Sequence, residues 1–305
     1  MPDSFVTLIL LNYNSSRFTF PCVESIRSTC LSDAYEIIVV DNNSSTDDFE
    51  RLKPIQNQPR LRLVRSRLNL GFAGGNMLGV QFARPETTHY FFLNNDCVLL
   101  NDVCGILRQF LDAHPDVGVC TAQMVDEKGR LQPSFGYFPT LAQKWLGHGL
   151  LRQFSPKAYP SDKAVYDQPV RVPVVTGSAL FVRADAFNAV GGLETAYFLY
   201  CEEEDLCQRL KRRGFSAALV PEARFVHYGG ESTNRNLAIE KEFYISLFHY
   251  YRQFHPVWQR PLFRLFFFLK NLRKFYRHPN YAKLAWFILK GSPQKESLRY
   301  RQVIR

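Results

Sequence analysis

The sequence predicts an α/β fold in which a mainly parallel sheet is flanked by helices. Three observations lead to this prediction. Within residues 1–125, short runs rich in β-branched and aromatic residues alternate with amphipathic stretches, as in sheets whose strands are joined by helices. The runs are almost continuously apolar, which is typical of strands buried on both faces. Polar residues gather where the runs end, at the sheet edge where open α/β folds bind ligands.

The elements follow one another in a regular order. The strands expected within residues 1–125 are "FVTLILLNYN", "EIIVVDNNSS", "LRLVRS", "HYFFLNND" and "VGVCTAQMV". Residues 126–172 are rich in Pro, Gly and aromatic residues, which predicts loops or a short excursion from the sheet. Beyond them, "VPVVTGSALFVRADAF" predicts a strand and a helix start, "CEEEDLCQRLKRRGF" predicts a helix, and "SAALVPEARFVHYGG" predicts two short strands.

Length and charge limit the classes of protein that fit. The 305 residues are 46% hydrophobic, which is ample for a core. Residues 240–305 carry 14 lysines and arginines against 3 acidic residues, whereas residues 1–239 carry 24 against 25. The basic character therefore belongs to a C-terminal segment. We expect one domain at residues 1–239 and a helical, basic, amphipathic extension at residues 240–305.

No signal peptide or spanning helix is evident, because the longest apolar runs are far shorter than the roughly 20 residues that cross a bilayer. The seven cysteines form no CxxC pair, so we interpret them as reduced, mostly buried thiols. These features together predict a cytoplasmic protein.

Two polar segments allow a ligand-binding and a structural interpretation. Asp41 and the residues after it suit hydrogen bonds to a nucleoside's base or ribose, but an Asx turn that caps the next helix explains them too. "NLGFAGGNMLG", at residues 69–79, lacks the GxGxxG spacing of dinucleotide loops. Its glycines fit either close approach of a phosphate or sugar, or a glycine-rich helix start.

The fourth strand ends in three polar residues, Asn94, Asn95 and Asp96. If this strand lies in the same sheet as the second, Asp96 emerges at the edge that carries Asp41. A divalent cation would then link its carboxylate to a nucleotide's diphosphate, because Mg2+ and Mn2+ prefer oxygen ligands and take several from phosphate and water. The alternative is that Asp96 caps the helix that begins near Asp102.

Four acidic residues, at positions 202–205, stand at the expected start of a helix. The helix dipole favours acids in a first turn, but four in succession repel one another and raise at least one pKa, as a general base requires. His227 follows an apolar strand and precedes two glycines. Its imidazole is a candidate ligand for a metal or phosphate, although a lone histidine is more often structural.

Taken in order, these segments resemble the family 2 glycosyltransferases, most closely the bacterial rhamnosyltransferase-like branch, over residues 5–235. The matching elements are "LNYN", "VVDNNSSTDD", "NLGFAGGNMLG", "FLNND", "VTGSALFVRADAF", "VGGLETAYFLYCEEEDLCQRLKRRGF" and "HYGGEST". The resemblance implies a GT-A fold and an inverting transfer of a sugar from a nucleotide diphosphate, of the dTDP-rhamnose or UDP-hexose type. The acceptor would be a glycan or lipid-linked glycan in cell-surface polysaccharide synthesis.

The resemblance also implies roles for individual residues. Glu203 stands where the family has its catalytic base, usually an Asp, and Glu202 is the other member of that acidic pair. The longer side chain at position 203 leaves open which of the two is the base. Asp96 matches the surviving aspartate of the DxD element and would hold Mg2+ or Mn2+ together with His227. The implied nucleotide-sugar site consists of Tyr13, Asn14, Asp41, Asn43, Asn69, Gly71, Gly74, Asn76, Asn94, Asn95 and Gly177.

Residues 262–278 have the spacing of an amphipathic helix. The apolar arc is Leu265, Phe268, Leu269, Leu272, Phe275 and Tyr276. The opposite arc is Lys270, Asn271, Arg273, Lys274, Arg277 and His278. Either residues 260–290 bind an anionic membrane surface, as lipid-linked acceptors would favour, or the apolar arc packs on the catalytic domain. The first interpretation predicts peripheral binding to the inner face of the cytoplasmic membrane.

Two functions of other classes compete with sugar transfer. One is a non-catalytic nucleotide-sugar-binding protein that has kept the fold. The other is a nucleic-acid-binding protein that uses the basic tail. We expect no nucleic acid as a partner, because the positive charge is confined to the tail and no RNA-binding motif is present.

Overall fold

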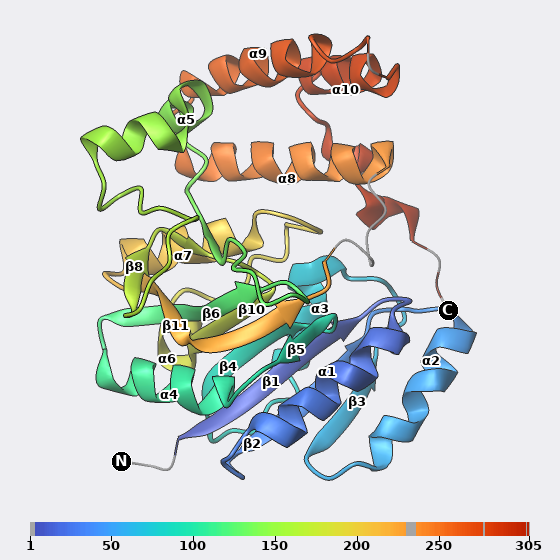
Figure 1. Ribbon diagram of the computed structural model, residues 1–305. Coiled ribbons are helices and arrows are strands. Elements are labelled where there is room, and N and C mark those ends of the chain that lie inside the picture. Colours follow the sequence, from blue (N-terminus) through green and yellow to red (C-terminus); the bar gives the residue numbers. More distant parts are fainter. Residues whose placement is uncertain (1–3, 230–235, 277, 303, 305) are drawn as a thin grey trace.

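The computed structural model describes residues 4–229, 236–276, 278–302 and 304. Its central sheet has nine strands, with helices on both faces, and a further layer of helices lies over the sheet at the top of Figure 1. Residues 230–233 of the "HYGGEST" motif and Arg277 of the basic arc lie outside the described residues.

The first half of the sheet is parallel, as predicted. Its strands, in spatial order, are β3 (Leu61–Arg65), β2 (Tyr35–Asp41), β1 (Phe5–Asn12) and β4 (Thr87–Asn94). Asn12 pairs with Asp41, and Leu11 pairs with Asn94. The polar ends of these strands therefore meet at one edge of the sheet, where the sequence predicts a ligand site.

The second half of the sheet is mixed. It contains β5 (Cys97–Leu99), β6 (Val117–Val125), β8 (Val170–Val172), β10 (Ala179–Arg183) and β11 (Ser216–His227). β10 lies antiparallel between β4 and β6, whereas β6 and β11 run parallel. The segment predicted as two short strands is the single strand β11, whose register shifts between Val220 and Arg224. Pro221 stands at the shift, where it provides no backbone donor.

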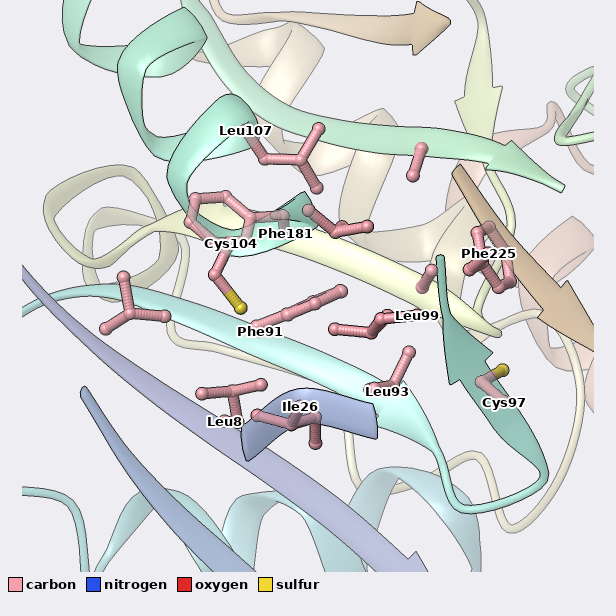
Figure 2. Close-up of a cluster of buried hydrophobic side chains, with 14 of the residues drawn as sticks. Leu8, Ile26, Phe91, Leu93, Cys97, Leu99, Cys104, Leu107, Phe181 and Phe225 are labelled. Atoms are coloured by element: carbon pink, nitrogen blue, oxygen red, sulfur yellow. The ribbon is translucent and has the colours of Figure 1, made fainter. Parts of the chain in front are cut away.

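Helices on the two faces of the sheet bury two apolar clusters. These helices are α1 (Ser16–Thr29), α2 (Thr46–Leu52), α3 (Gly71–Val80), α4 (Val103–Ala113), α6 (Ala184–Ala189) and α7 (Glu202–Arg212). In Figure 2, Ile26 of α1 and Leu107 of α4 meet Phe91 and Phe181 of the sheet in one buried cluster. The second cluster packs α3, α6 and α7 against the opposite face.

A helical layer from the end of the chain covers the loop before α7. It consists of α8 (Leu237–Phe254), α9 (Gln259–Leu272), α10 (Asn280–Leu289) and the 3-10 turns η2 (Gln294–Glu296) and η3 (Leu298–Arg301). Its apolar cluster includes Tyr197 and Cys201, which lie just before α7. This cluster joins the basic segment to the part of the chain that carries the acidic residues.

Residues 126–172 contain a helix that the sequence does not predict. α5 (Leu141–Phe154) stands beside α9 in the upper layer of Figure 1, between the short strands β7 (Phe135–Gly136) and β9 (Val174–Val175), which pair with each other. None of its residues is buried, and Gly147 breaks it with a φ of 76°. A helix without a buried face has no need of apolar periodicity, which explains why the pattern is missing.

The predicted helix at residues 262–278 is α9, which ends at Leu272. Its buried face consists of Phe263, Phe267 and Asn271. The expectation that Asn271 lies on the polar arc is wrong, because its side chain is buried and donates to the Tyr244 hydroxyl at 2.8 Å. The predicted apolar arc is largely exposed: Leu265, Leu269, Leu272, Phe275 and Tyr276 are all among the exposed large apolar residues.

The expectation for the cysteines is confirmed. All seven cysteines are free, and all but Cys30 are buried. No described helix combines the length and the apolar character that a membrane crossing requires.

The close packing of the glycine-rich helix α3 predicts that one added methyl group lowers the stability of the fold. A Cβ on Gly79 would lie 2.5 Å from the Ile9 side chain of β1, whereas Gly149 of α5 has nothing within 4 Å. We expect Gly79→Ala to lower the free energy of unfolding by about 1–3 kcal/mol through overpacking. Gly149→Ala, the matched control, raises it by up to about 1 kcal/mol through helix propensity. Urea unfolding measures both, and equal stability of the two variants would contradict the close packing.

Candidate active site

A pocket of about 440 Å³ opens at the edge of the sheet where β1, β2 and β4 end. Several of the predicted site residues line it: Tyr13, Asn43, Asn69, Gly71, Asn94, Asn95 and Asp96. The other predicted site residues are outside its lining: Asn14, Asp41, Gly74, Asn76, Gly177, Glu202, Glu203 and His227. The sequence therefore locates the pocket, although the second group lies outside its lining.

Asp41 holds the loops around the pocket together. Its side chain is fully buried, and its carboxylate accepts from the Asn12 amide at 3.1 Å and from the Ser44 backbone N–H at 3.3 Å. Asn14 likewise accepts from the backbone N–H of Ser45 at 2.8 Å. The loops after β1 and β2 are thereby fixed to each other, which matches the turn interpretation of this segment.

Asn42 organises the next wall of the pocket, although the sequence does not single it out. Its side-chain N–H groups donate to Asn69 Oδ1 and to the Gly71 carbonyl, each at 3.0 Å, while its Oδ1 accepts from the Leu70 backbone at 2.8 Å. Asn42 stands in a run of similar polar residues. Only its hydrogen bonds to the neighbouring loop distinguish Asn42 from the other residues of that run.

Gly71 brings α3 close to the loop that precedes α7. It has a φ of 75°, and a Cβ at this position would clash with the Phe198 carbonyl. The same carbonyl accepts from the Phe72 backbone N–H at 2.7 Å. Only glycine permits this approach.

The other two predicted residues of α3 face inward. Gly74 packs against Leu70, where an added Cβ would come within 2.9 Å of the Leu70 Cβ. Asn76 is buried and donates to the Phe72 carbonyl at 3.0 Å. Both residues serve the packing of the helix.

Asp96 and His227 lie together at one side of the pocket. The Asp96 carboxylate is 3.1 Å from His227 Nε2. Pairing of β5 with β11 places Cys97 opposite His227, and the Tyr228 N–H donates to the Asp96 carbonyl at 3.1 Å. Asp102 caps α4 by accepting from the Gly105 N–H at 3.0 Å. The alternative that Asp96 caps this helix is therefore wrong.

The two asparagines before Asp96 have different partners. The Asn94 amide is 3.4 Å from His227 Nε2, and its backbone N–H donates to the Ser178 carbonyl at 2.9 Å. The Asn95 amide donates to the hydroxyls of Ser15 and Thr19, both at 2.8 Å. Asn95 thus fixes the turn after β4 to α1, whereas the Asn94 side chain lies beside His227, a candidate metal ligand.

The acidic helix α7 starts from an unusual backbone. Tyr200 and Cys201 have φ values of 75° and 69°, a left-handed conformation that is uncommon for side chains other than glycine. The chain turns there so that the carboxylate of Glu203 accepts from the Gly177 backbone N–H. A Cβ on Gly177 would stand 3.5 Å from Glu203 Oε1, so the two predicted residues are in contact.

Burial is the first cause of raised pKa values in this cluster. It raises the pKa of Glu203, and it raises the pKa of Glu202 well above the ordinary value with help from the charge of Glu203. The pKa of Glu204 is raised to about 8 by burial and by Glu203, in spite of Lys144 nearby. Such carboxylates are stronger bases than exposed ones, as general-base catalysis requires.

Asp205 is the structural member of the acidic run. Its fully buried carboxylate pairs with Arg209 one turn later, and Tyr197 donates to it at 3.2 Å. Arg209 also donates to the carbonyls of Val190 and Gly192, at 2.6 and 2.7 Å. These contacts hold α7 against the loops around it.

The pocket includes residues from the C-terminal end that the sequence did not predict. Leu298, Arg301 and Gln302 line it, together with Ile239 of α8. The resemblance to a known family stops near residue 235, and neither interpretation of the tail, membrane docking or packing on the catalytic domain, predicts that it lines the pocket. No pattern within the tail indicates that it returns to the sheet.

Comparison with known proteins identifies a matching family. Residues 7–189 match the family described as "Glycosyl transferase family 2". The chain is 30% identical over 220 residues to an N-acetylglucosaminyl-diphospho-decaprenol L-rhamnosyltransferase of Mycobacterium tuberculosis, covering 66% of this chain and 69% of the relative. It is 27% identical over 232 residues to the rhamnosyltransferase WbbL of Escherichia coli, covering 73% and 83%.

Two solved structures share the fold. GalNAc-T7 with UDP, GalNAc and Mn2+ matches with a TM-score of 0.58 at 13% identity, over 80% of this chain and 47% of that chain. The mannosyltransferase PcManGT of Pyrobaculum calidifontis, in complex with GDP-Man and Mn2+, matches with a TM-score of 0.58 at 15% identity, over 95% and 76%. These matches confirm the predicted GT-A fold.

The buried acidic cluster predicts that stability falls as pH rises. The pKa of Glu204 is about 8 in the folded protein against an ordinary 4.5. Between these two pKa values the folded state keeps a proton that the unfolded chain has released. The contribution of this proton to the free energy of unfolding is therefore complete below pH 4.5 and is lost as the pH approaches 8. We expect the Tm of the wild type to fall across this interval and that of Glu204→Gln to fall less. Glu222→Gln, an exposed control on β11, keeps the wild-type slope in scanning fluorimetry.

A Glu204→Gln slope equal to that of the wild type would contradict the assignment of this proton to Glu204. The comparison of slopes is independent of any offset in Tm that the substitution itself produces.

Proposed function

The chain belongs to glycosyl transferase family 2, and from this membership we propose that it transfers a sugar, with inversion, from a nucleotide-diphosphate donor. The observation that carries the proposal is the link between Asp96 and Glu203. Residues 177 and 178 contact both sides: the Gly177 N–H donates to Glu203, and the Ser178 carbonyl accepts from Asn94 and Cys97, which flank Asp96. The proposed cation ligand Asp96 and the proposed base Glu203 thus stand on either side of one short segment.

The relatives suggest the chemical class of both substrates. Two of them are named as rhamnosyltransferases, and the name of one includes a lipid diphosphate that carries N-acetylglucosamine. We therefore propose a donor of the dTDP-rhamnose or UDP-hexose type. The acceptor is a glycan or lipid-linked glycan in cell-surface polysaccharide synthesis. We also retain, as a proposal, the division into a catalytic domain at residues 1–239 and an extension at residues 240–305.

Glu203 is the base that we assign. It takes the proton of an acceptor hydroxyl, whose oxygen then bonds to the anomeric carbon on the face opposite the diphosphate, while the bond from that carbon to the diphosphate breaks. The Gly177 N–H orients the Glu203 carboxylate. In Glu202, by contrast, Oε2 is buried without a hydrogen-bond partner among the described residues. Burial and the charge of Glu203 raise the pKa of Glu202 well above its ordinary value, so Glu202 ionises less readily, which favours Glu203 as the base.

Asp96 and His227 are the residues that we assign to a divalent cation, Mg2+ or Mn2+. With Cys97 they form a group whose ligand atoms all lie within 4.8 Å of one another. The pKa of the Cys97 thiol is raised well above its ordinary value by burial, and the thiol donates to the Ser178 carbonyl. One carboxylate and one imidazole remain, which suits a hard cation that shares phosphate oxygens. When bound, the cation offsets charge on the leaving diphosphate.

The nucleotide side of the site is proposed to lie along the loops after β1 and β2. Tyr13 is 45% exposed at the pocket and offers its ring to the base. Asn43, Asn69 and Gly71 line the same pocket and offer amide and backbone groups for the ribose and phosphates. Asp41 would contribute to nucleotide binding indirectly, by holding the loop after β2 in place.

The helical layer is proposed to dock on an anionic membrane. Exposed aromatic residues occur on this layer and on the adjacent α5: Trp145 on α5, Phe275 after α9 and Trp286 on α10, all 55–58% exposed. Trp145 contacts Phe266 with ring centroids 5.4 Å apart, so α5 and α9 share one surface. Exposed lysines and arginines alternate with these apolar groups, and each cation adds about 1 kcal/mol near acidic lipid.

A panel of nucleotide sugars tests the proposed activity. Purified protein with Mg2+ or Mn2+ is screened by thermal shift, and donors that raise the Tm are then tested for hydrolysis and transfer. Turnover of a dTDP- or UDP-linked sugar supports the proposal. Binding without any turnover would instead indicate a non-catalytic nucleotide-sugar-binding protein.

Substitution of the base should separate chemistry from binding. We expect Glu203→Gln to lower kcat by about 10²–10⁴-fold and to leave the donor Kd close to that of the wild type, because the amide keeps its size but takes no proton. Asp96→Ala should weaken donor binding and turnover together. Steady-state kinetics and calorimetry measure both effects. A larger loss of kcat in Glu202→Gln than in Glu203→Gln would transfer the role of base to Glu202.

If the helical layer docks on a membrane, its exposed aromatic residues can be substituted to reduce membrane binding without unfolding the protein. We expect Phe275→Ser combined with Trp286→Ser to reduce partitioning onto vesicles of acidic phospholipid about tenfold or more, since each ring contributes roughly 1.5–3 kcal/mol when buried. Leu31→Ser, at an 85% exposed residue outside this layer, is the control. Co-sedimentation at two salt concentrations measures binding. Equal binding of RNA and vesicles would contradict a specific membrane surface.

A further inference from the structure

The end of the described chain returns from the helical layer to the sheet. After α10, residues 293–302 run back toward the sheet edge in Figure 1. Leu298, Arg301 and Gln302 line the same pocket as Asp96 and Tyr13. Residues more than 200 positions apart in the chain therefore line one pocket, the proposed donor site.

Specific contacts fix this returning segment to α8. Glu242 is 1% exposed, and its carboxylate accepts from the Ser297 hydroxyl at 2.9 Å and from the Leu298 backbone N–H at 2.8 Å. Lys241 pairs with Glu296 at 2.5 Å. A buried carboxylate that receives two hydrogen bonds is a strong anchor. The position of η3 at the pocket is therefore defined by the fold.

Arg301 is the only lysine, arginine or histidine among the described residues that line the pocket. Its guanidinium forms no hydrogen bond or salt bridge with another described residue, although its charge acts on the buried Glu242 carboxylate, whereas Arg299 donates to the Thr195 carbonyl. The pocket-lining carboxylate is Asp96. A dianionic diphosphate near this carboxylate needs positive charge from the protein as well as from a cation.

We propose that residues 297–302 are a wall of the donor site and that Arg301 binds the diphosphate of the nucleotide sugar. The inference rests on the proposed function above. The planar guanidinium donates two parallel hydrogen bonds to phosphate oxygens, a geometry that an ammonium group lacks. The triplet at positions 94–96 has a single carboxylate to bind the cation, so the cation is weakly held. Arg301 supplies further positive charge to neutralise the diphosphate.

The test compares ligands that differ only in phosphate. Calorimetry with Mg2+ measures the Kd of dTDP, UDP and the matching monophosphates and nucleosides for wild type and variants. We expect Arg301→Ala to weaken diphosphate binding about tenfold or more, monophosphate binding less, and nucleoside binding not at all. Arg301→Lys recovers part of the loss. Lys295→Ala removes an exposed cation of the same segment outside the pocket and keeps the wild-type affinities.

The outcomes separate this inference from the proposed function. Wild-type protein that binds neither dTDP nor UDP would overturn both the donor class and the role of Arg301. Diphosphate binding that is unchanged in Arg301→Ala would overturn the role of Arg301 and leave sugar transfer intact. An equal loss for nucleosides and diphosphates would overturn it too, because the side chain would then act on the shape of the pocket. Steeper salt dependence of diphosphate affinity in the wild type than in Arg301→Ala supports the charge contact.

Discussion

The buried amide of Asn12 is the interaction on which the site depends. Its nitrogen donates to Asp41, Ser44 and Asp48 at 2.9–3.1 Å, and its oxygen accepts from Thr19 at 3.0 Å and from Asn95 at 3.3 Å. One side chain thus joins the ends of β1, β2 and β4 and the first turns of α1 and α2. Buried polar networks of this kind are rigid when each member has a partner. The polar edge of the sheet is therefore a fixed surface before any ligand binds.

The two halves of the sheet carry different parts of the proposed site. The parallel half presents the loops that suit a nucleotide, as open α/β sheets do at their carboxyl edge. The antiparallel strand β10 interrupts this order, and the residues just before it contact both the turn of Asp96 and the base Glu203. Gly71 fixes the loop before α7 from the other side. The reacting groups belong to distant segments, and short backbone contacts determine their spacing.

Sequence patterns were sufficient for the parts of the fold that are buried and periodic. The parallel strands, the position of Asp96 and the acidic start of α7 follow from apolar runs and the residues after them. α5 escaped prediction because it buries no residue, and Asn42 because hydrogen bonds between loops leave no periodic signal. Arg301 is missed for a third reason: its proposed role depends on the anchor at Glu242, a tertiary contact between residues 55 and 56 positions apart. Local patterns carry no information about such a return.

The left-handed pair Tyr200 and Cys201 has a consequence for protein engineering. Each residue costs about 1–2 kcal/mol relative to a relaxed backbone, yet both contribute to the apolar cluster beneath the helical layer. A thermostabilisation campaign that scores residues by backbone preference alone would select glycine at these positions. Glycine would relax the turn but remove both side chains from the cluster and loosen the start of α7, so the loss of packing would outweigh the relief of strain and the orientation of Glu203 would be lost with it. At this pair, backbone strain, apolar packing and the position of the base are coupled, so none of them can be changed alone.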